Sequence, residues 1–95
     1  MPDITASRDV LVANEKGFHI RPAHLLMKMA SGFQAQVTII KDNQVVDAKS
    51  MMDLLTLVAQ NGTTLTLRAR GDDAQAAVDA LAQLVESGFG EMTEQ

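Results

Sequence analysis

The sequence predicts an α+β domain in which helices cover one face of an antiparallel sheet. Apolar residues make up 46% of the 95 residues, enough for one packed core, so we expect a single domain over residues 1–95. Two apolar spacings alternate along the chain. One repeats every second residue, typical of a strand with one wet side, and the other every third or fourth, typical of a helix with one buried face. Their order is βαββαβα, and such alternation of half-wet strands with amphipathic helices favours this layered arrangement.

The first third of the chain predicts a strand and a helix. We expect residues 1–6 to be a loose start and residues 8–13, with Val and Leu at their centre, to be a strand. A helix is expected from Pro22, with Gly32 as its C-terminal cap, because the intervening apolar residues recur at helical spacing. These apolar residues are Ala23, Leu26, Met27 and Ala30.

A hairpin and a short helix are predicted next. The β-branched segment 36–41 predicts a strand that turns at 42–43 into a short partner at 44–47. Ser50 is expected to open a second helix, which ends at the Asn-Gly pair 61–62. The apolar residues at helical spacing in it are Met51, Leu54, Leu55 and Val58.

The last third predicts a half-buried strand and a third helix. Residues 64–70 alternate, with Leu65, Leu67 and Ala69 on one face and Thr or Arg on the other. Residues 71–73, Gly-Asp-Asp, supply a turn and a helix cap, and the helix is expected to end at Gly88. Its inward residues are expected to be Ala74, Ala77, Val78, Leu81 and Val85.

The composition excludes several classes of function. A net charge of −4 and only three aromatic residues argue against nucleic-acid binding, which needs a basic surface and stacking rings. No apolar run approaches the ~18 residues of a membrane span, so we expect no membrane insertion. The chain has no Cys and two His, which excludes thiolate metal sites and leaves too few ligands for most histidine zinc sites. We therefore expect no metal, and a lack of Cys fits the reducing cytoplasm.

The most informative segment is G-F-H-I-R-P-A at residues 17–23, where the first helix begins. Pro22 fits a first helical turn because its φ is already helical and its missing N–H needs no partner there. Gly17 can adopt a positive φ just upstream. An anion in this place would meet unpaired peptide N–H groups, the positive end of the helix dipole and the Arg21 guanidinium. His19 is therefore our candidate phosphoryl acceptor.

Each of these side chains also has a simpler interpretation. His19 could be an ordinary surface or capping histidine, and Arg21 a solvated surface charge. However, a helix N-terminus disfavours imidazolium and favours the negative charge of a phosphorylated ring. Arg21 in a first turn opposes the helix dipole, and pairing with phosphate is the simplest benefit that would offset this cost.

The order of elements together with G-F-H-I-R-P-A resembles the HPr family, the histidine-containing phosphocarriers of the bacterial sugar phosphotransferase system. The resemblance covers about residues 7–91. It also includes A-K-S at 48–50, the N-G-T turn, the G-D-D lead into the last helix and the closing G-F-G-E. It implies an open-faced β-sandwich, with a four-stranded antiparallel sheet and three helices on one side.

The resemblance also implies residue roles and partners. His19 would take a phosphoryl group on Nδ1 from phosphorylated Enzyme I, itself charged by phosphoenolpyruvate, and pass it to a IIA domain of a sugar permease. Arg21 would neutralise the phosphoryl oxygens in both transfers, with no cofactor. We expect a monomeric carrier rather than an enzyme, because so small a domain with one exposed imidazole cannot enclose a phosphoenolpyruvate site.

Ser50 has two interpretations that remain open. The resemblance implies a regulatory site, phosphorylated in some lineages by an ATP-dependent HPr kinase/phosphorylase. Alternatively, Ser50 and Asp53 form a variant capping box, S-x-x-D, in which Ser50 only caps the short helix. Asp47 and Asp53 would also repel an incoming phosphate.

We also predict a partner surface beside His19. Met51, Met52 and Leu55 cannot all face inward on so short a helix, and methionines adapt to differently shaped partners. Core packing is the alternative interpretation, and it is the one we expect for Leu54 and Val58. The predicted surface consists of Ile20, His24, Met51, Met52 and Leu55, with His24 as a rim contact rather than a second acceptor.

Two other functions remain open. A signalling module of the same fold could serve carbon or nitrogen regulation without sugar uptake, which Asp53 and the acidic balance permit. A plain ligand-binding or interaction domain could carry the motif by chance; in that case His19→Ala would leave phosphoryl transfer unchanged.

Overall fold

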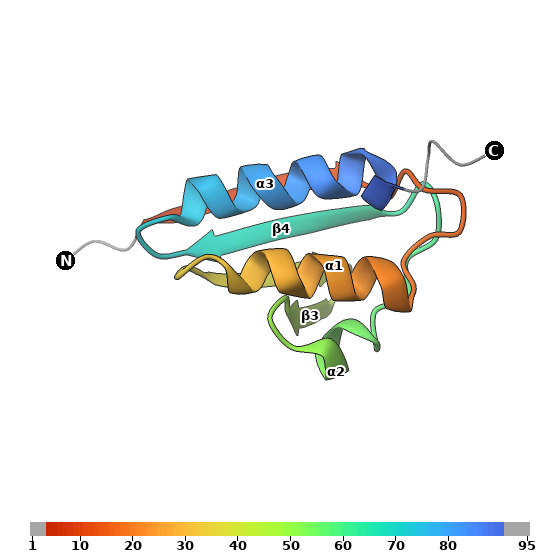
Figure 1. Ribbon diagram of the computed structural model, residues 1–95, viewed down its shortest axis with the longest axis horizontal. Coiled ribbons are helices and arrows are strands. Elements are labelled where there is room, and N and C mark those ends of the chain that lie inside the picture. Colours follow the sequence, from red (N-terminus) through yellow and green to blue (C-terminus); the bar gives the residue numbers. More distant parts are fainter. Residues whose placement is uncertain (1–3, 91–95) are drawn as a thin grey trace.

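The computed structural model describes residues 4–90 and has two layers, a sheet and a set of helices (Figure 1). The elements in chain order are β1 (Thr5–Leu11), α1 (Ile20–Ser31), β2 (Gln36–Lys41), β3 (Gln44–Asp47), α2 (Met51–Leu54), β4 (Thr64–Arg70) and α3 (Ala74–Glu86), followed by a short 3₁₀ turn, η1 (Gly88–Gly90). The predicted order βαββαβα is confirmed. Glu91, the last residue of G-F-G-E, lies outside the described residues.

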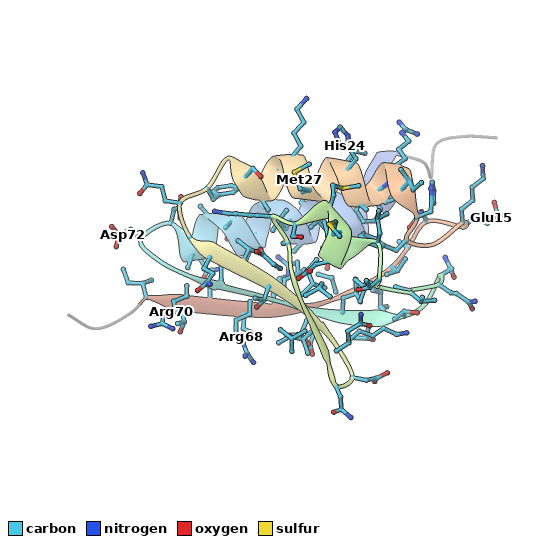
Figure 2. All side chains as sticks on the ribbon, turned by 90° about the horizontal axis from the view of Figure 1, so that it is seen from below. Glu15, His24, Met27, Arg68, Arg70 and Asp72 are labelled. Carbon is cyan, nitrogen blue, oxygen red and sulfur yellow. The ribbon has the colours of Figure 1, made fainter. Side chains whose placement is uncertain are left out.

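The sheet is antiparallel throughout, with the strand order β1-β4-β2-β3. β4 is central and pairs with β1 from Thr5↔Arg70 to Leu11↔Thr64. The helices lie on one face, and Arg68 and Arg70 point away from them on the other (Figure 2). The alternation predicted for β4 is confirmed, because Leu65, Leu67 and Ala69 are buried between the sheet and the helices.

The core fills the space between the two layers. α3 packs on β1 and β4, and α2 lies beside β3 (Figure 1). Many of the helical residues that face the sheet are alanines, which allow close approach, and leucines from β4 fill the space opposite them. Each fully buried Leu or Val stabilises the fold by about 1.5–3 kcal/mol. The buried helical residues are Pro22, Ala23, Leu26 and Ala30 of α1 and Ala74, Ala77, Val78, Leu81, Ala82 and Val85 of α3.

Three predicted boundaries in the first third were wrong: both ends of β1 and the start of α1. β1 begins at Thr5 and ends at Leu11, three residues earlier than expected at its start, and residues 5–7 pair with 68–70 of β4. Thr5 and Ala6 therefore belong to a strand rather than to a loose start, whereas residues 1–3 of that prediction lie outside the described residues. The outward residues of the 5–7 segment are polar, so its short alternation carried little apolar signal. α1 begins at Ile20 rather than Pro22, with His19 as the N-cap.

The second helix is much shorter than predicted. α2 covers only Met51–Leu54, and Val58, expected in the core, is 65% exposed. Leu57 and Ala59 are buried instead. Beyond the turn that follows α2, Ala59 forms an antiparallel bridge with Phe18. Inward positions after Leu54 therefore alternate as in a strand, although the sequence spacing still fitted a helix.

Candidate functional site

His19 is the N-cap of α1, and its backbone and side chain have different surroundings. The backbone is extended, with φ −138° and ψ −166°, and the His19 carbonyl accepts a hydrogen bond from Ala23 N at 2.9 Å. The imidazole is exposed and makes no capping bond to the helix. An anion on this ring would therefore lie at the positive end of the α1 dipole.

The first turn of α1 favours a bound anion. Pro22 is buried and has no N–H, so Ile20 and Arg21 carry the first N–H groups of the helix, which in a helix have no intrahelical acceptor. Arg21 is exposed two residues after His19. No acidic residue lies in this first turn. Amides and guanidinium together suit the oxygens of a phosphoryl group.

Gly17 shapes the approach to His19. Its φ is +73°, as the sequence predicted, and a Cβ added there would lie 2.7 Å from the carbonyl oxygen of Ala59. The adjacent Phe18 N–H donates to that same oxygen at 2.7 Å. The loop at residues 12–18 therefore lies directly against the backbone that follows α2.

Asn14 is a site residue that the sequence analysis missed. It is fully buried, and its Nδ2 donates to the Gly17 carbonyl at 2.6 Å, while Gly17 N donates back to the Asn14 carbonyl at 3.1 Å. The available signal was the N-x-x-G spacing, since Asn side chains commonly bond to the backbone of turns. Asn14 thus stabilises the turn of residues 14–17 and so the position of Gly17.

The predicted partner residues lie on α1, on α2 and directly after α2. α1 and α2 are in contact. Ile20 is 67% exposed, Met52 82% and Leu55 52%, whereas Met51 is half-buried against the core. His24 is exposed on α1 and points away from the sheet (Figure 2). The two helices therefore display an apolar surface near the start of α1, and the exposed side chain of Val58 was missed.

Ser50 is the N-cap of α2, as the capping interpretation predicted. The second half of the predicted capping box is not formed, because Ser50 N donates to the Asp47 carbonyl rather than to the Asp53 carboxylate. The Ser50 Oγ accepts a hydrogen bond from Asp53 N at 3.2 Å. The Asp53 carboxylate in turn accepts from Asp47 N at 3.0 Å, and the Asp47 carboxylate accepts from Lys49 N at 2.9 Å. The hydroxyl is thus part of a hydrogen-bonded turn that contains two carboxylates.

Two kinds of site are not found in the part of the chain that the structure describes. Between residues 4 and 90, no group of three or more His, Cys, Asp or Glu side chains could hold a metal ion. Over the same residues, no helix has the length and apolar character needed to cross a membrane.

Comparison with known proteins identifies relatives over nearly the whole chain. A family model described as the PTS HPr component phosphorylation site matches residues 6–87. The phosphocarrier protein HPr of Cupriavidus necator is 40% identical over 84 residues, which cover 88% of this chain and 94% of that protein. The phosphocarrier protein NPr of Shewanella violacea is also 40% identical over 84 residues, covering 88% and 92%. The crystal structure of an HPr from Thermoanaerobacter tengcongensis superposes with a TM-score of 0.82 at 41% identity, covering 96% and 98% of the two chains.

Proposed function

Because this chain belongs to the HPr family of phosphocarrier proteins of the phosphotransferase system, we propose that His19 is the residue that carries its phosphoryl group. Members of this family are phosphocarriers rather than enzymes. One observation carries the proposal: an exposed imidazole stands at the N-cap of α1, makes no capping bond and has an arginine two residues away. Such a site favours the charge that phosphorylation adds.

The proposed transfer keeps the number of phosphoryl groups constant. The lone pair of His19 Nδ1 attacks the phosphorus carried by phosphorylated Enzyme I, and a new N–P bond forms as the bond to Enzyme I breaks. The Arg21 guanidinium and the first-turn amides stabilise the phosphoryl oxygens. The reverse sequence passes the group to a IIA domain. No cofactor enters either step, and we propose that both occur in the cytoplasm.

Mass spectrometry tests the acceptor. After incubation with Enzyme I and phosphoenolpyruvate, the chain should gain one acid-labile phosphate. His19→Ala should gain none, whereas His24→Ala, which changes the other exposed histidine of the motif region, should gain it as the wild type does. Phosphorylation of His19→Ala would refute the proposal.

The surface made of Ile20, His24, Met51, Met52 and Leu55 is the proposed docking site for both partners, and Val58 extends it. Its exposed apolar side chains suit a transient interface that must fit several partners. Met52→Glu should raise the KM of Enzyme I for this carrier without changing the urea midpoint. The control is Val45→Glu, because Val45 is a similarly exposed apolar residue on β3. Equal effects of the two substitutions would reject this surface.

We further propose that the receiving partner is a IIA domain of a sugar permease. The alternative is a regulatory carrier of the same fold, and this chain is as similar to the phosphocarrier protein NPr of Shewanella violacea as to the HPr of Cupriavidus necator. A relay assay separates the two: the phosphorylated chain is mixed with sugar-specific IIA domains and onward transfer is measured. Transfer to none of them would favour the regulatory role.

Regulatory phosphorylation of Ser50 is a separate proposal, and the capping bond from Asp53 N supports the structural alternative. The test is incubation with a purified HPr kinase/phosphorylase and ATP, with Ser50→Ala as the control. An unmodified wild-type hydroxyl would remove the regulatory role and leave the His19 proposal intact.

A further inference from the structure

The acceptor loop, residues 12–18, contains no helix and no strand of the sheet. It nevertheless sets the position of His19 at the start of α1. Its position comes from the segment that follows α2, which is more than 40 residues away in the sequence. We propose that Asn61 is a positioning residue for His19, whose side-chain amide holds the middle of the acceptor loop in place. This inference rests on the proposed function of His19.

The Asn61 amide makes two hydrogen bonds to the loop backbone. Its Nδ2 donates to the carbonyl of Ala13 at 3.0 Å and to the carbonyl of Asn14 at 3.2 Å. A primary amide has two N–H donors, so this one group has enough donors for both adjacent peptide units. Asn61 is exposed, and its amide nevertheless points at the loop rather than only at water.

These bonds lead directly toward the acceptor. The Asn14 carbonyl that receives the Asn61 amide also receives Gly17 N at 3.1 Å, and Asn14 Nδ2 donates to the Gly17 carbonyl at 2.6 Å. Gly17 is two residues from His19. A shift of the Asn14 peptide would therefore be passed to Gly17 and to the backbone that orients the imidazole.

Asn61 differs in kind from the other anchors of the loop. Backbone hydrogen bonds fix its two ends: Val12 N to Thr63 O at 2.9 Å, Gly62 N to Val12 O at 2.8 Å, and Phe18 N to Ala59 O at 2.7 Å. Those bonds do not depend on side-chain identity. Asn61 is the side chain that reaches the stretch between the fixed ends, so a substitution there should loosen the loop without detaching it.

A loosened loop should affect chemistry more than stability. Misplacing a reacting group by about 1 Å can slow a reaction by two orders of magnitude. Of the two bonds of Asn61, by contrast, one is exposed and the other partly buried, and the loop ends stay anchored without them. We expect the maximal rate of His19 phosphorylation to fall roughly tenfold, with a small change in the urea midpoint. A merely structural role would lower both together.

The test uses Asn61→Asp, Asn61→Ala and the matched control Asn43→Asp. Asn61→Asp keeps the shape but replaces the donor with an oxygen that would face two carbonyl oxygens. Asn61→Ala removes the amide without adding charge. Asn43→Asp makes the same charge change in the β2–β3 turn. Phosphorylation by Enzyme I is followed over a range of carrier concentrations, so that KM and kcat are obtained separately.

Both Asn61 variants should lower kcat roughly tenfold and change KM less than twofold, and the Asn43 variant should match the wild type. Hydrogen exchange gives a readout that needs no partner: the Gly17 amide should exchange faster in Asn61→Ala, while the Ala48 amide, bonded to Val37 O at 3.0 Å, should not. Wild-type kcat or unchanged Gly17 exchange in both Asn61 variants would overturn the inference. If the wild type itself takes no phosphate on His19, the proposed function fails, and the exchange experiment still decides whether Asn61 holds the loop.

Discussion

The main chain of His19 begins α1, whereas its imidazole ring makes no capping bond to the helix. Most N-cap side chains are short and polar and bond back to the first helix amides, but the imidazole of His19 does not. The His19 carbonyl still accepts the ordinary first helical bond, from Ala23 N. The ring is therefore not committed to holding the helix. This separation lets a chemically reactive side chain stand at the helix N-terminus without loss of the helix.

Gly17 can be tested against a second glycine with a similar backbone. Gly17 and Gly62 have φ of +73° and +90°, so Ala at either should cost about 1–2 kcal/mol of unfolding free energy. At Gly17 the new Cβ would also meet Ala59 O at 2.7 Å, whereas at Gly62 it would meet nothing within 4 Å. Urea denaturation should show Gly17→Ala less stable than Gly62→Ala by about 1–3 kcal/mol. Equal losses would mean that the loop moves away from the 59–61 backbone at little cost.

Arg21 should contribute to transfer through its geometry as well as its charge. A charge-assisted hydrogen bond is worth about 1.5–3 kcal/mol, so Arg21→Ala should slow single-turnover phosphorylation roughly 10- to 100-fold. Arg21→Lys should lie between the wild type and Ala, because lysine keeps the charge but loses the planar fork. Arg68→Ala, on the open face of the sheet (Figure 2), should leave the rate unchanged. A full rate in Arg21→Ala would exclude the proposed role.

The residues of the site were not equally predictable from the sequence. His19, Gly17 and Arg21 form one continuous motif whose local backbone already restricts what each can do. Asn14 and Asn61 matter through hydrogen bonds, and those of Asn61 cross 47 and 48 positions in the chain. A local sequence pattern does not relate residues so far apart in the chain, so only the folded structure reveals these hydrogen bonds.

At the level of elements, α2 shows how far apolar spacing can mislead. Met51, Leu54, Leu55 and Val58 fit a helix, but the chain leaves the helix after Leu54. Instead of continuing the helix, the 57–59 segment buries the side chains of Leu57 and Ala59, and Ala59 pairs with Phe18. A short apolar run fits either period, and tertiary contacts decide between them. The Ser50 cap, which depends on local geometry alone, was predicted correctly.

Asp73 begins α3 at the position predicted for a cap, but its side chain acts elsewhere. It makes no capping bond to α3, and its carboxylate accepts Gln34 N at 2.8 Å and Ala35 N at 2.7 Å. The hydrogen bond from Gln34 N, supported by that from Ala35 N, lowers the pKa of Asp73 below its ordinary value of 3.8, although desolvation opposes this. Asp73 thus joins the start of α3 to the turn between α1 and β2.

This link should make stability depend on pH. A carboxyl group whose pKa is lower in the folded chain stabilises it above the unfolded pKa and loses that effect as pH falls through the folded pKa. Asp73→Asn should therefore lower the urea midpoint at pH 7, and the difference from the wild type should shrink as pH falls below about 4. Asp72→Asn, a neighbouring exposed carboxylate, is the control. A difference that stays constant with pH would contradict an ionic contribution.

For the molecule as a whole, the two edge strands of the sheet, β1 and β3, influence whether two chains can pair through their sheets. Edge strand β3 has only four residues, and edge strand β1 carries Arg8 and Asp9. Short or charged edges discourage pairing with a second chain. Arg8 is also held toward α3 by Glu86 at 3.1 Å.

We therefore predict a monomer. Sedimentation equilibrium at micromolar concentrations should give the mass of one chain, with no dependence on concentration. Arg8→Val, which removes one of the two edge charges, should increase self-association, whereas Arg68→Val on the central strand should do so less. A stable wild-type dimer would contradict the prediction.

The amino-acid sequence was enough to predict the order of the elements, the buried faces of β4, α1 and α3, and the motif that begins α1, because each depends on residues that are close in the chain. Long-range packing was needed to show that β4 lies between β1 and β2, that Ala59 pairs with Phe18 beyond the turn after α2, and that Asn61 reaches the loop at residues 12–18. The physical reason is the range of the interactions. Helix spacing, caps and glycine turns act over a few residues, whereas strand order and the loop contacts depend on which distant surfaces are buried together.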